Sequence, residues 1–305
     1  METFTFDSAG TRCEAWLVPA RTEDLATAAG RPVVVLCHGL AGTKDSGLLP
    51  FAEAFADAGL DAMLFDYRGF GGSEGSPRQV VSISQQLADL QAAIATAKRL
   101  PGVDPHRVVL WGVSLGGGHV ISAAAGREDV AAVVSVVPLV DGLAAARLAA
   151  KHHETAQLLR STGAGIASRI RRAAGRGPTM IPVVGRPGEP GALTLPGAYD
   201  DYLSIAGPTW RNEIAADVVM ELGSRTPAKD AKRLRSPWLV QIADYDRSAP
   251  PYSQAKAAFA GRAEVRHYPG DHFDVFPGKP WHEPAARHAV QFLRRHLAVK
   301  EPARA

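Results

Sequence analysis

Apolar runs of strand length alternate with stretches of helical hydrophobic spacing over residues 31–137. Continuous apolar runs at residues 32–37, 61–65, 107–111 and 130–137 predict strands that are covered on both faces. Between them, residues 48–58, 80–99 and 115–125 have the spacing of amphipathic helices, and in the second of these Ile83, Leu87, Leu90 and Ile94 form one stripe. This alternation predicts an α/β fold with a mostly parallel sheet flanked by helices.

Two shorter strands are predicted at the front of the chain, at residues 3–6 and 12–17, joined by a turn at Ser8, Ala9 and Gly10. We expect them to be antiparallel and to form the edge of the sheet. Near the end of the chain the alternation resumes, with strands at residues 238–243 and 264–268 and helices at residues 252–259 and 284–296.

The segment between these two regions, residues 138–235, lacks the alternation. It is rich in Ala and Arg, with helix-like pieces at residues 143–160 and 213–222 and a Pro- and Gly-rich loop at residues 185–197. A loop of that composition and length inside a compact unit is often functional. We therefore predict one α/β core formed by residues 1–137 and 236–305, interrupted by a helical cap at residues 138–235.

Composition fits an ordinary globular protein of 305 residues, with 46% hydrophobic and 21% charged residues. The net charge of +3 is too small to indicate nucleic-acid binding. No apolar run approaches the roughly 20 residues that span a bilayer, and the first residues do not resemble a signal peptide, so we expect a cytoplasmic protein without a membrane partner. Cys37 ends an apolar strand and is predicted to be a core residue, not half of a disulfide.

Positive charge gathers in the predicted cap. Between Gly142 and Gly188 the only acidic residue is Glu154, whereas basic residues stand at positions 147, 151, 160, 169, 171, 172, 176 and 186. The favoured interpretation is a solvated helix face. The alternative is steering of an anionic substrate, such as a carboxylate, a coenzyme A thioester or a carrier-protein arm.

The sequence Gly-Val-Ser-Leu-Gly at residues 112–116 lies directly between a predicted strand and a predicted helix. In that context the pattern G-x-S-x-G is typical of a sharp turn that projects a serine hydroxyl out of the backbone. Glycine is required where the chain passes close to itself, and the helix N-terminus favours developing negative charge. We therefore expect Ser114 to be a nucleophile.

Other landmarks accompany Ser114 in a recognisable order: Cys-His-Gly-Leu at residues 37–40, Phe-Asp-Tyr-Arg-Gly-Phe-Gly at residues 65–71, and a late Asp and His. With these motifs the sequence resembles the α/β-hydrolase superfamily over nearly the whole chain outside residues 138–235. The runs at residues 112–119 and 269–276 look like those of bacterial esterases of the dienelactone-hydrolase and cocaine-esterase type. They are also similar to those of hydrolases and acyltransferases of polyketide pathways.

The resemblance implies an acid after the seventh strand and a histidine after the eighth. Ala243 stands where the family has a glycine before its acid, and this alignment, together with Pro250, favours Asp246. Asp244 is the alternative, and it would otherwise cap a turn or helix. The histidine in the expected loop is His272.

Two main-chain amides complete the site that the resemblance implies. One N–H group follows the nucleophile and the other follows the third strand, so the expected oxyanion hole is formed by Leu115 and Leu40. Asp66 and Arg68 are expected to hold their loop together.

These residues predict a serine hydrolase that cleaves a carboxylic ester or thioester through an acyl-enzyme on Ser114, with a Ser-His-Asp triad. The first alternative is an acyltransferase or cyclising enzyme of a biosynthetic pathway that uses the same triad. The second is a non-hydrolytic binder built on a degenerate hydrolase, since a fold alone does not determine function.

Substrate recognition is expected mainly from the cap. Tyr199, Tyr202 and Trp210 are candidates for an aromatic wall over Ser114, with packing inside the cap as the alternative for each. No metal-ligand spacing such as H-E-x-x-H occurs, so we expect neither a metal nor a cofactor. The predicted partner is a small-molecule ester or thioester, anionic or carrier-bound if the arginines face it.

Overall fold

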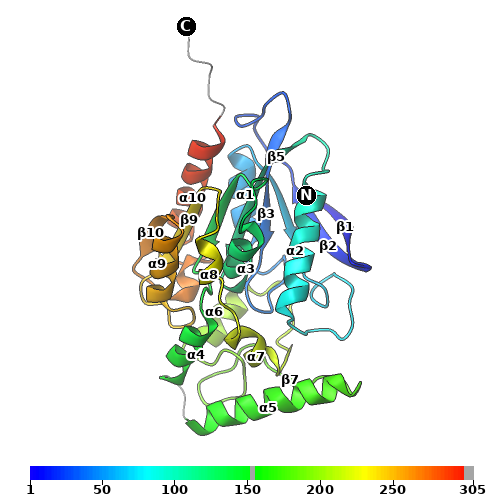
Figure 1. Cartoon of the computed structure of the whole chain (residues 1–305), viewed down its shortest axis with the longest axis vertical. Helices are drawn as coiled ribbons and strands as arrows, with labels where there is room; N and C mark the ends of the chain where they lie inside the picture. The colour runs from blue at the N-terminus through cyan, green and yellow to red at the C-terminus, as the bar shows by residue number, and fades with distance from the viewer. Residues whose placement is uncertain (152–154, 299–305) are drawn as a thin grey trace.

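An eight-stranded sheet crosses the molecule in this computed structural model, which describes residues 1–151 and 155–298 (Figure 1). The strand order is β1-β2-β4-β3-β5-β6-β9-β10; β2 pairs antiparallel with β1 and with β4, whereas the other neighbouring strands pair in parallel. The strands are β1 (Glu2–Ser8), β2 (Thr11–Val18), β3 (Arg31–Cys37), β4 (Asp61–Phe65), β5 (Val103–Val113), β6 (Ala132–Val136), β9 (Trp238–Ala243) and β10 (Glu264–Tyr268). The predicted mostly parallel sheet with an antiparallel edge is confirmed.

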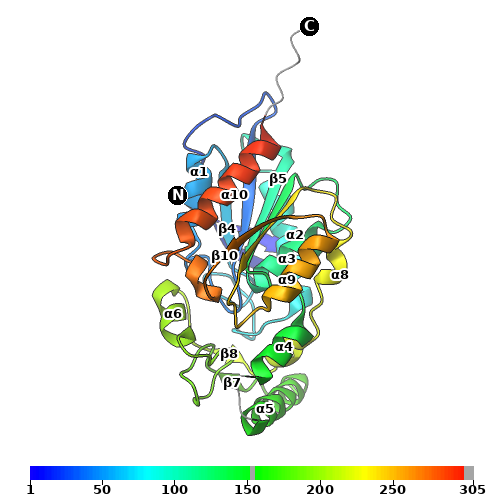
Figure 2. The ribbon, with the colours of Figure 1, turned by 90° about the vertical axis from the view of Figure 1, so that its left-hand side faces the viewer.

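Helices cover both faces of the sheet, which is why its central strands read as continuous apolar runs (Figure 2). One face is covered by α1 (Leu49–Asp57) and α10 (His282–Leu297). The other face is covered by α2 (Ile83–Ala97), α3 (Leu115–Ala124) and α9 (Pro251–Ala260). Cys13 and Cys37 are buried and unpaired, and the prediction of Cys37 as a core residue is confirmed.

Most of residues 138–235, called the inserted segment below, lies beyond the carboxyl ends of the parallel strands (Figure 1), whereas its last helix packs against α3 and α9. The segment carries α4 (Gly142–Ala150), α5 (Thr155–Ala173), α6 (Ala198–Ile205), α7 (Val218–Gly223), α8 (Ala228–Ala231) and a small sheet of β7 (Met180–Ile181) and β8 (Ile214–Ala215). The single helix predicted at residues 143–160 is wrong: α4 ends at Ala150 and α5 begins at Thr155. Among the described helices, none is both long and apolar enough to cross a membrane.

Candidate active site

Ser114 occupies the sharp turn between β5 and α3, with a backbone φ of 57° and ψ of −119°. This left-handed φ is strained for a residue with a side chain. A Cβ atom added at Gly116 would lie 2.4 Å from the carbonyl oxygen of His38, and one added at Gly112 would lie 2.3 Å from the carbonyl oxygen of Gly116. The two glycines are therefore required by close approach, and they let the turn present the serine hydroxyl at the end of the strand.

His272 faces Ser114 from the short 3₁₀ helix His272–Val275 that follows β10. Its Nε2 lies 3.0 Å from Ser114 Oγ, and its Nδ1 lies 2.7 Å from Oδ2 of Asp246. The side chain of Asp271 accepts the backbone N–H of His272 at 2.8 Å and so caps the helix at the imidazole. The structure thus brings the three side chains together in one hydrogen-bonded row.

Asp246 is held rigidly in the loop after β9. Its Oδ1 accepts the backbone amides of Ser248 at 2.8 Å and Ala249 at 2.7 Å, which leaves Oδ2 to face the imidazole. The rival carboxylate, Asp244, points to the surface instead, where its Oδ1 lies 2.7 Å from Nδ1 of His267. Of the two acids considered from the sequence, Asp246 is the one in contact with His272.

The buried carboxylate changes the protonation of the imidazole. Burial on its own lowers the pKa of His272, but the charge of Asp246 and the hydrogen bond to it outweigh this, and the pKa is raised above its ordinary value. An imidazolium is therefore stabilised at this position. Arg247 hydrogen-bonds Asp271 through its backbone N–H at 3.0 Å and its Nε at 2.6 Å, and so ties the loop of the acid to the loop of the histidine.

The amides of Leu40 and Leu115 lie on the two loops that flank the serine hydroxyl. Leu115 is the first residue of α3, and first-turn amides have no acceptor within their helix. The N–H of Leu40 has no acceptor among the described residues, whereas its carbonyl accepts the hydroxyl of Tyr202 at 2.6 Å. Both N–H groups are thus available to an oxygen bound beside Ser114.

The loop that carries Leu40 is anchored in the core by a buried ion pair. Lys44 Nζ lies 2.6 Å from Oδ2 of Asp66 and 2.7 Å from Oε1 of Glu14. Asp66 also accepts the backbone amides of Lys44 at 2.6 Å and Gly72 at 2.9 Å. Arg68 lies in the same loop as Asp66 and hydrogen-bonds Asp89 through its Nε at 2.8 Å. These contacts agree with the predicted loop-holding role of Asp66 and Arg68.

A small pocket opens onto Ser114, with an empty volume of about 390 Å³, its open mouth included. Among the residues that the structure describes, its walls carry no carboxylate, lysine or arginine. They do include the two imidazoles of His38 and His272, and burial lowers the pKa of His38. The walls are largely apolar or backbone, formed by His38, Gly39, Leu40, Gly42, Ser46, Val113, Leu193, Tyr202, Ile205, Phe273 and Phe276.

Of the three aromatic residues predicted to bind substrate, the structure brings only Tyr202 to the pocket. Trp210 stacks against the ring of Tyr202, with centroids 5.0 Å apart, and Tyr199 lies under the guanidinium of Arg186. Sequence reasoning missed Leu193, Ile205 and Phe276. Phe276 follows the His272 loop at helical spacing from Phe273, and this is a signal that could have indicated it.

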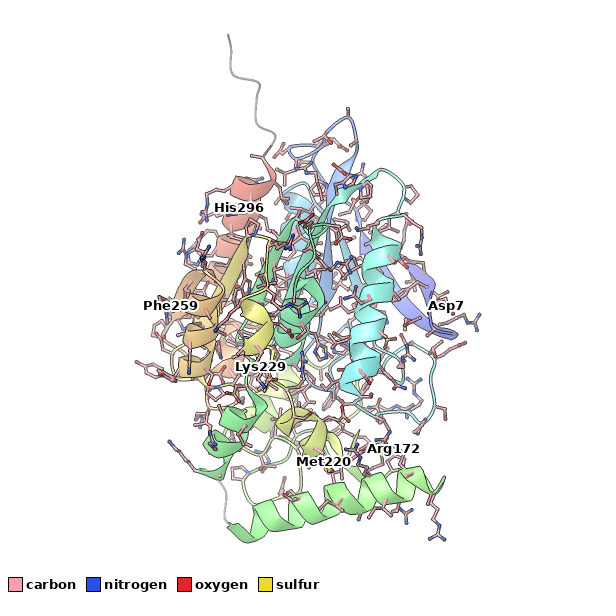
Figure 3. All side chains as sticks on the ribbon, viewed as in Figure 1. Asp7, Arg172, Met220, Lys229, Phe259 and His296 are labelled. Atoms are coloured by element: carbon pink, nitrogen blue, oxygen red, sulfur yellow. The ribbon has the colours of Figure 1, made fainter. Side chains whose placement is uncertain are left out.

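The arginines of the inserted segment whose side chains the structure describes lie away from the pocket. Arg172, on the side of α5 that faces the rest of the molecule (Figure 3), pairs with Asp217 at 2.5 Å. Arg186 pairs with Asp200 at 3.1 Å, and the side chains at positions 147, 169, 171 and 176 are exposed. The side chain of Arg160 lies outside the described residues. Within residues 1–151 and 155–298 there is also no cluster of three His, Cys, Asp or Glu side chains that could hold a metal ion.

Comparisons with known proteins agree with this architecture. Residues 28–175 match a family described as serine aminopeptidase, S33. The quorum-quenching protein AidA of Acinetobacter baumannii is 37% identical over 298 residues, which cover 97% of this chain and 95% of AidA. The thiohydrolase aneE of Aspergillus aculeatus is 34% identical over 160 residues, 52% of this chain and 50% of aneE.

A third similarity is seen both in sequence and in a solved structure. The polyketide transferase grgF of a Penicillium species is 33% identical over 132 residues, 43% of this chain and 42% of grgF. The crystal structure of an α/β hydrolase GrgF from Penicillium aligns with a TM-score of 0.77 and 23% identity, over 98% of this chain and 99% of that one. Because the two aligned chains are only 23% identical, this structural similarity shows a shared fold and nothing about the activity.

Proposed function

Because this chain belongs to the α/β-hydrolase family and is an enzyme, we propose that it cleaves a carboxylic ester or thioester through an acyl-enzyme on Ser114. The observation that carries the proposal is the hydrogen-bonded row of Ser114, His272 and Asp246 at a strained turn. A serine hydroxyl is a weak nucleophile unless a base accepts its proton, and this row supplies the base and the group that orients it.

The reaction follows from these distances. As Ser114 Oγ attacks the acyl carbon, its proton passes to Nε2 of His272, 3.0 Å away. Asp246 keeps the proton of Nδ1 in place and stabilises the imidazolium. The imidazolium then protonates the leaving alcohol or thiol, and water attacks the acyl-enzyme with His272 again as the base.

The developing oxyanion is the second requirement of the chemistry. We assign its stabilisation to the N–H groups of Leu40 and Leu115. Both residues lie close to the hydroxyl of Ser114, and neither N–H has an acceptor among the described residues. One such donor typically contributes about 3–4 kcal/mol to lowering the barrier. Both donors belong to the backbone, so side-chain substitution at these positions does not remove them.

The walls of the pocket support a neutral, apolar acyl group as substrate. A buried anion would need a cation or several donors to compensate its lost hydration, and among the residues with described side chains no arginine or lysine lines the pocket. The inserted segment supplies Leu193, Tyr202 and Ile205 to the walls and is proposed to act as the cap that selects the acyl group. The arginines of α5 are then a solvated face of that cap.

Acyl transfer is a second candidate, favoured by the likeness to a polyketide transferase. The same acyl-enzyme would be attacked by an alcohol or amine in place of water. Product analysis with and without a nucleophilic acceptor separates the two, because hydrolysis gives free acid in both cases. AidA is named a quorum-quenching protein, which adds quorum-sensing signal molecules to the substrates to be assayed.

The test of the proposed function is hydrolysis of short-chain p-nitrophenyl esters by the Ser114→Ala variant. Turnover should fall by several orders of magnitude, as it does when a triad member is removed. Ser84→Ala, at an exposed serine on α2, is the matched control and should keep the full rate. Wild-type turnover by the Ser114→Ala variant would contradict the proposal.

A further inference from the structure

The Leu40–Ala41 peptide lies in a conformation that the loop does not favour by itself. Ala41 has a φ of 52°, in the left-handed region, although it is not a glycine. Such residues persist only where surrounding contacts determine their conformation. The neighbouring carbonyl of Gly39 is held within the loop, by the amide of Gly42 at 3.3 Å and by Nδ1 of His38 at 3.0 Å.

The carbonyl of Leu40 is held from outside the loop. It accepts the hydroxyl of Tyr202, on α6 of the inserted segment, at 2.6 Å. Tyr202 is only 5% exposed, so this hydrogen bond lies away from water. Losing the donor would leave a buried carbonyl unsatisfied, and residue Leu40 would gain by shifting toward another partner, which would displace its N–H in the adjoining Gly39–Leu40 peptide as well.

Tyr202 is itself fixed on both sides. Its ring stacks on Trp210 with an interplanar angle of 29°, and it packs edge-on against Phe273, the residue after His272, with centroids 5.8 Å apart. Helix α6 and the loop after it are tied down by two contacts: Nζ of Lys279 lies 2.5 Å from Asp201 within the helix, and Asp45 accepts the amide of Thr209 in the loop at 2.9 Å. The hydroxyl is therefore presented to Leu40 from a rigid support.

We propose that Tyr202 is a positioning residue of the oxyanion hole: its hydroxyl holds the carbonyl of Leu40, so that Leu40, whose N–H belongs to the preceding Gly39–Leu40 peptide, stays in place beside Ser114. This role rests on the proposed function. It makes the inserted segment a part of the catalytic machinery as well as a wall of the pocket, because a residue of that segment determines the geometry of a core loop.

Positioning and wall-forming make different kinetic predictions. A donor aimed at the oxyanion acts when charge develops in the transition state, so its misplacement lowers kcat. A wall residue contacts the acyl group in both ground and transition states, so its loss changes KM and depends on acyl-chain length. The phenol ring of Tyr202 lines the pocket, whereas its hydroxyl binds the loop, so the two roles can be separated by Tyr202→Phe.

The experiment compares wild type, Tyr202→Phe and Tyr199→Phe on p-nitrophenyl acetate and hexanoate. Tyr202→Phe should lower kcat by about tenfold to a hundredfold, below the 10²–10³ that loss of a whole oxyanion donor costs. KM should stay within about twofold, and the loss should be the same for both esters. An arylboronic acid, which places an oxygen in the oxyanion hole when it adds to Ser114, should bind more weakly by a similar factor. Tyr199→Phe is the control and should retain wild-type kcat.

Trp210→Leu is the second variant, since Trp210 supports Tyr202 without lining the pocket. It should lower kcat less than Tyr202→Phe and add no further loss in the double variant, because the two changes act through one hydroxyl. If Tyr202→Phe does not fold, as judged by its thermal melt, Trp210→Leu carries the same test. Wild-type kcat in the folded variant, or a change confined to a chain-length-dependent KM, would overturn the inference.

Running Ser114→Ala alongside separates this inference from the proposed function. An inactive wild type, or an active Ser114→Ala variant, means that the ester-hydrolase proposal itself has failed. An active wild type, an inactive Ser114→Ala variant and an unimpaired Tyr202→Phe variant mean that the hydrolase proposal stands and the role of Tyr202 is wrong.

Discussion

Replacing Asp246 by Asn tests the orientation of the imidazole directly. Two backbone amides, those of Ser248 and Ala249, donate to Oδ1 of Asp246 at 2.8 and 2.7 Å. An asparagine must keep its carbonyl oxygen at that position, because an NH₂ group there would face two donors. Its NH₂ group then replaces Oδ2, 2.7 Å from Nδ1 of His272.

An NH₂ group at that point reverses the hydrogen bond. It donates to Nδ1, so the proton of the neutral imidazole moves to Nε2, the atom that faces Ser114. His272 then cannot accept the serine proton. Loss of the correct tautomer in a Ser-His-Asp site lowers kcat by about 10⁴-fold, which corresponds to about 5.5 kcal/mol at ~1.4 kcal/mol for each tenfold. The fold should survive, since a buried charge is replaced by a neutral group of the same shape.

The assay is kcat for p-nitrophenyl butyrate, with urea unfolding of both proteins to show that the variant is folded. Asp244→Asn is the matched control: it makes the same chemical change two residues away, on a carboxylate that contacts the surface residue His267. It should keep the wild-type rate. A folded Asp246→Asn enzyme with more than a tenth of wild-type kcat would refute the tautomer argument, and so would an equal loss in Asp244→Asn.

Three further outcomes are expected. His272 must be neutral to act as the base, and its pKa is raised. We therefore expect kcat/KM to fall on acidification, with the midpoint of the pH–rate profile above the ordinary histidine pKa of 6.5. A midpoint below 6.5 would contradict this. Asp66→Ala leaves the buried Lys44 without its main partner, so we expect the free energy of unfolding, measured in urea, to fall by about 3 kcal/mol. Asp57→Ala, at an exposed ion pair, is the control and should leave the free energy of unfolding unchanged. Ile205→Ala enlarges the pocket wall and should raise the kcat/KM ratio of hexanoate to butyrate esters about tenfold, and an unchanged ratio would show that the acyl group lies elsewhere.

The sheet was predictable from sequence because burial on two faces leaves an unmistakable apolar run. The runs at residues 32–37 and 61–65 correspond closely to β3 and β4, and the spacing at residues 80–99 corresponds to α2. The role of Ser114 could be predicted for a related reason. The glycines around it are required by close main-chain contacts, which any member of the fold must make. The placement of Asp246 near His272 needed the resemblance, since the residues alone left Asp244 open.

The inserted segment was less predictable, because its contacts are long-range and its helices are short. An Ala-rich stretch gave one predicted helix where the structure has α4 and α5. The sequence offered no reason to prefer one of the three aromatic residues as a pocket residue. In the structure Tyr202 lines the pocket, whereas Trp210 stacks on the ring of Tyr202. Tyr199 and Tyr202 share α6, so which of them lines the pocket depends on which face of this helix meets the core loops, and no local pattern in eight residues specifies that face.

Strand order accounts for how four loops far apart in sequence meet at one point. Leu40 follows β3 and Ser114 follows β5, which are adjacent and parallel, so an amide and the hydroxyl emerge side by side. Asp246 follows β9 and His272 follows β10, again an adjacent parallel pair. The core thus supplies the relative position of all the reacting groups, and their ordering cost is met by folding, not by substrate binding. In the proposed function the inserted segment closes the pocket and steadies the Leu40 loop, so exchanging its wall residues should alter acyl preference while the Ser114–His272 distance is retained.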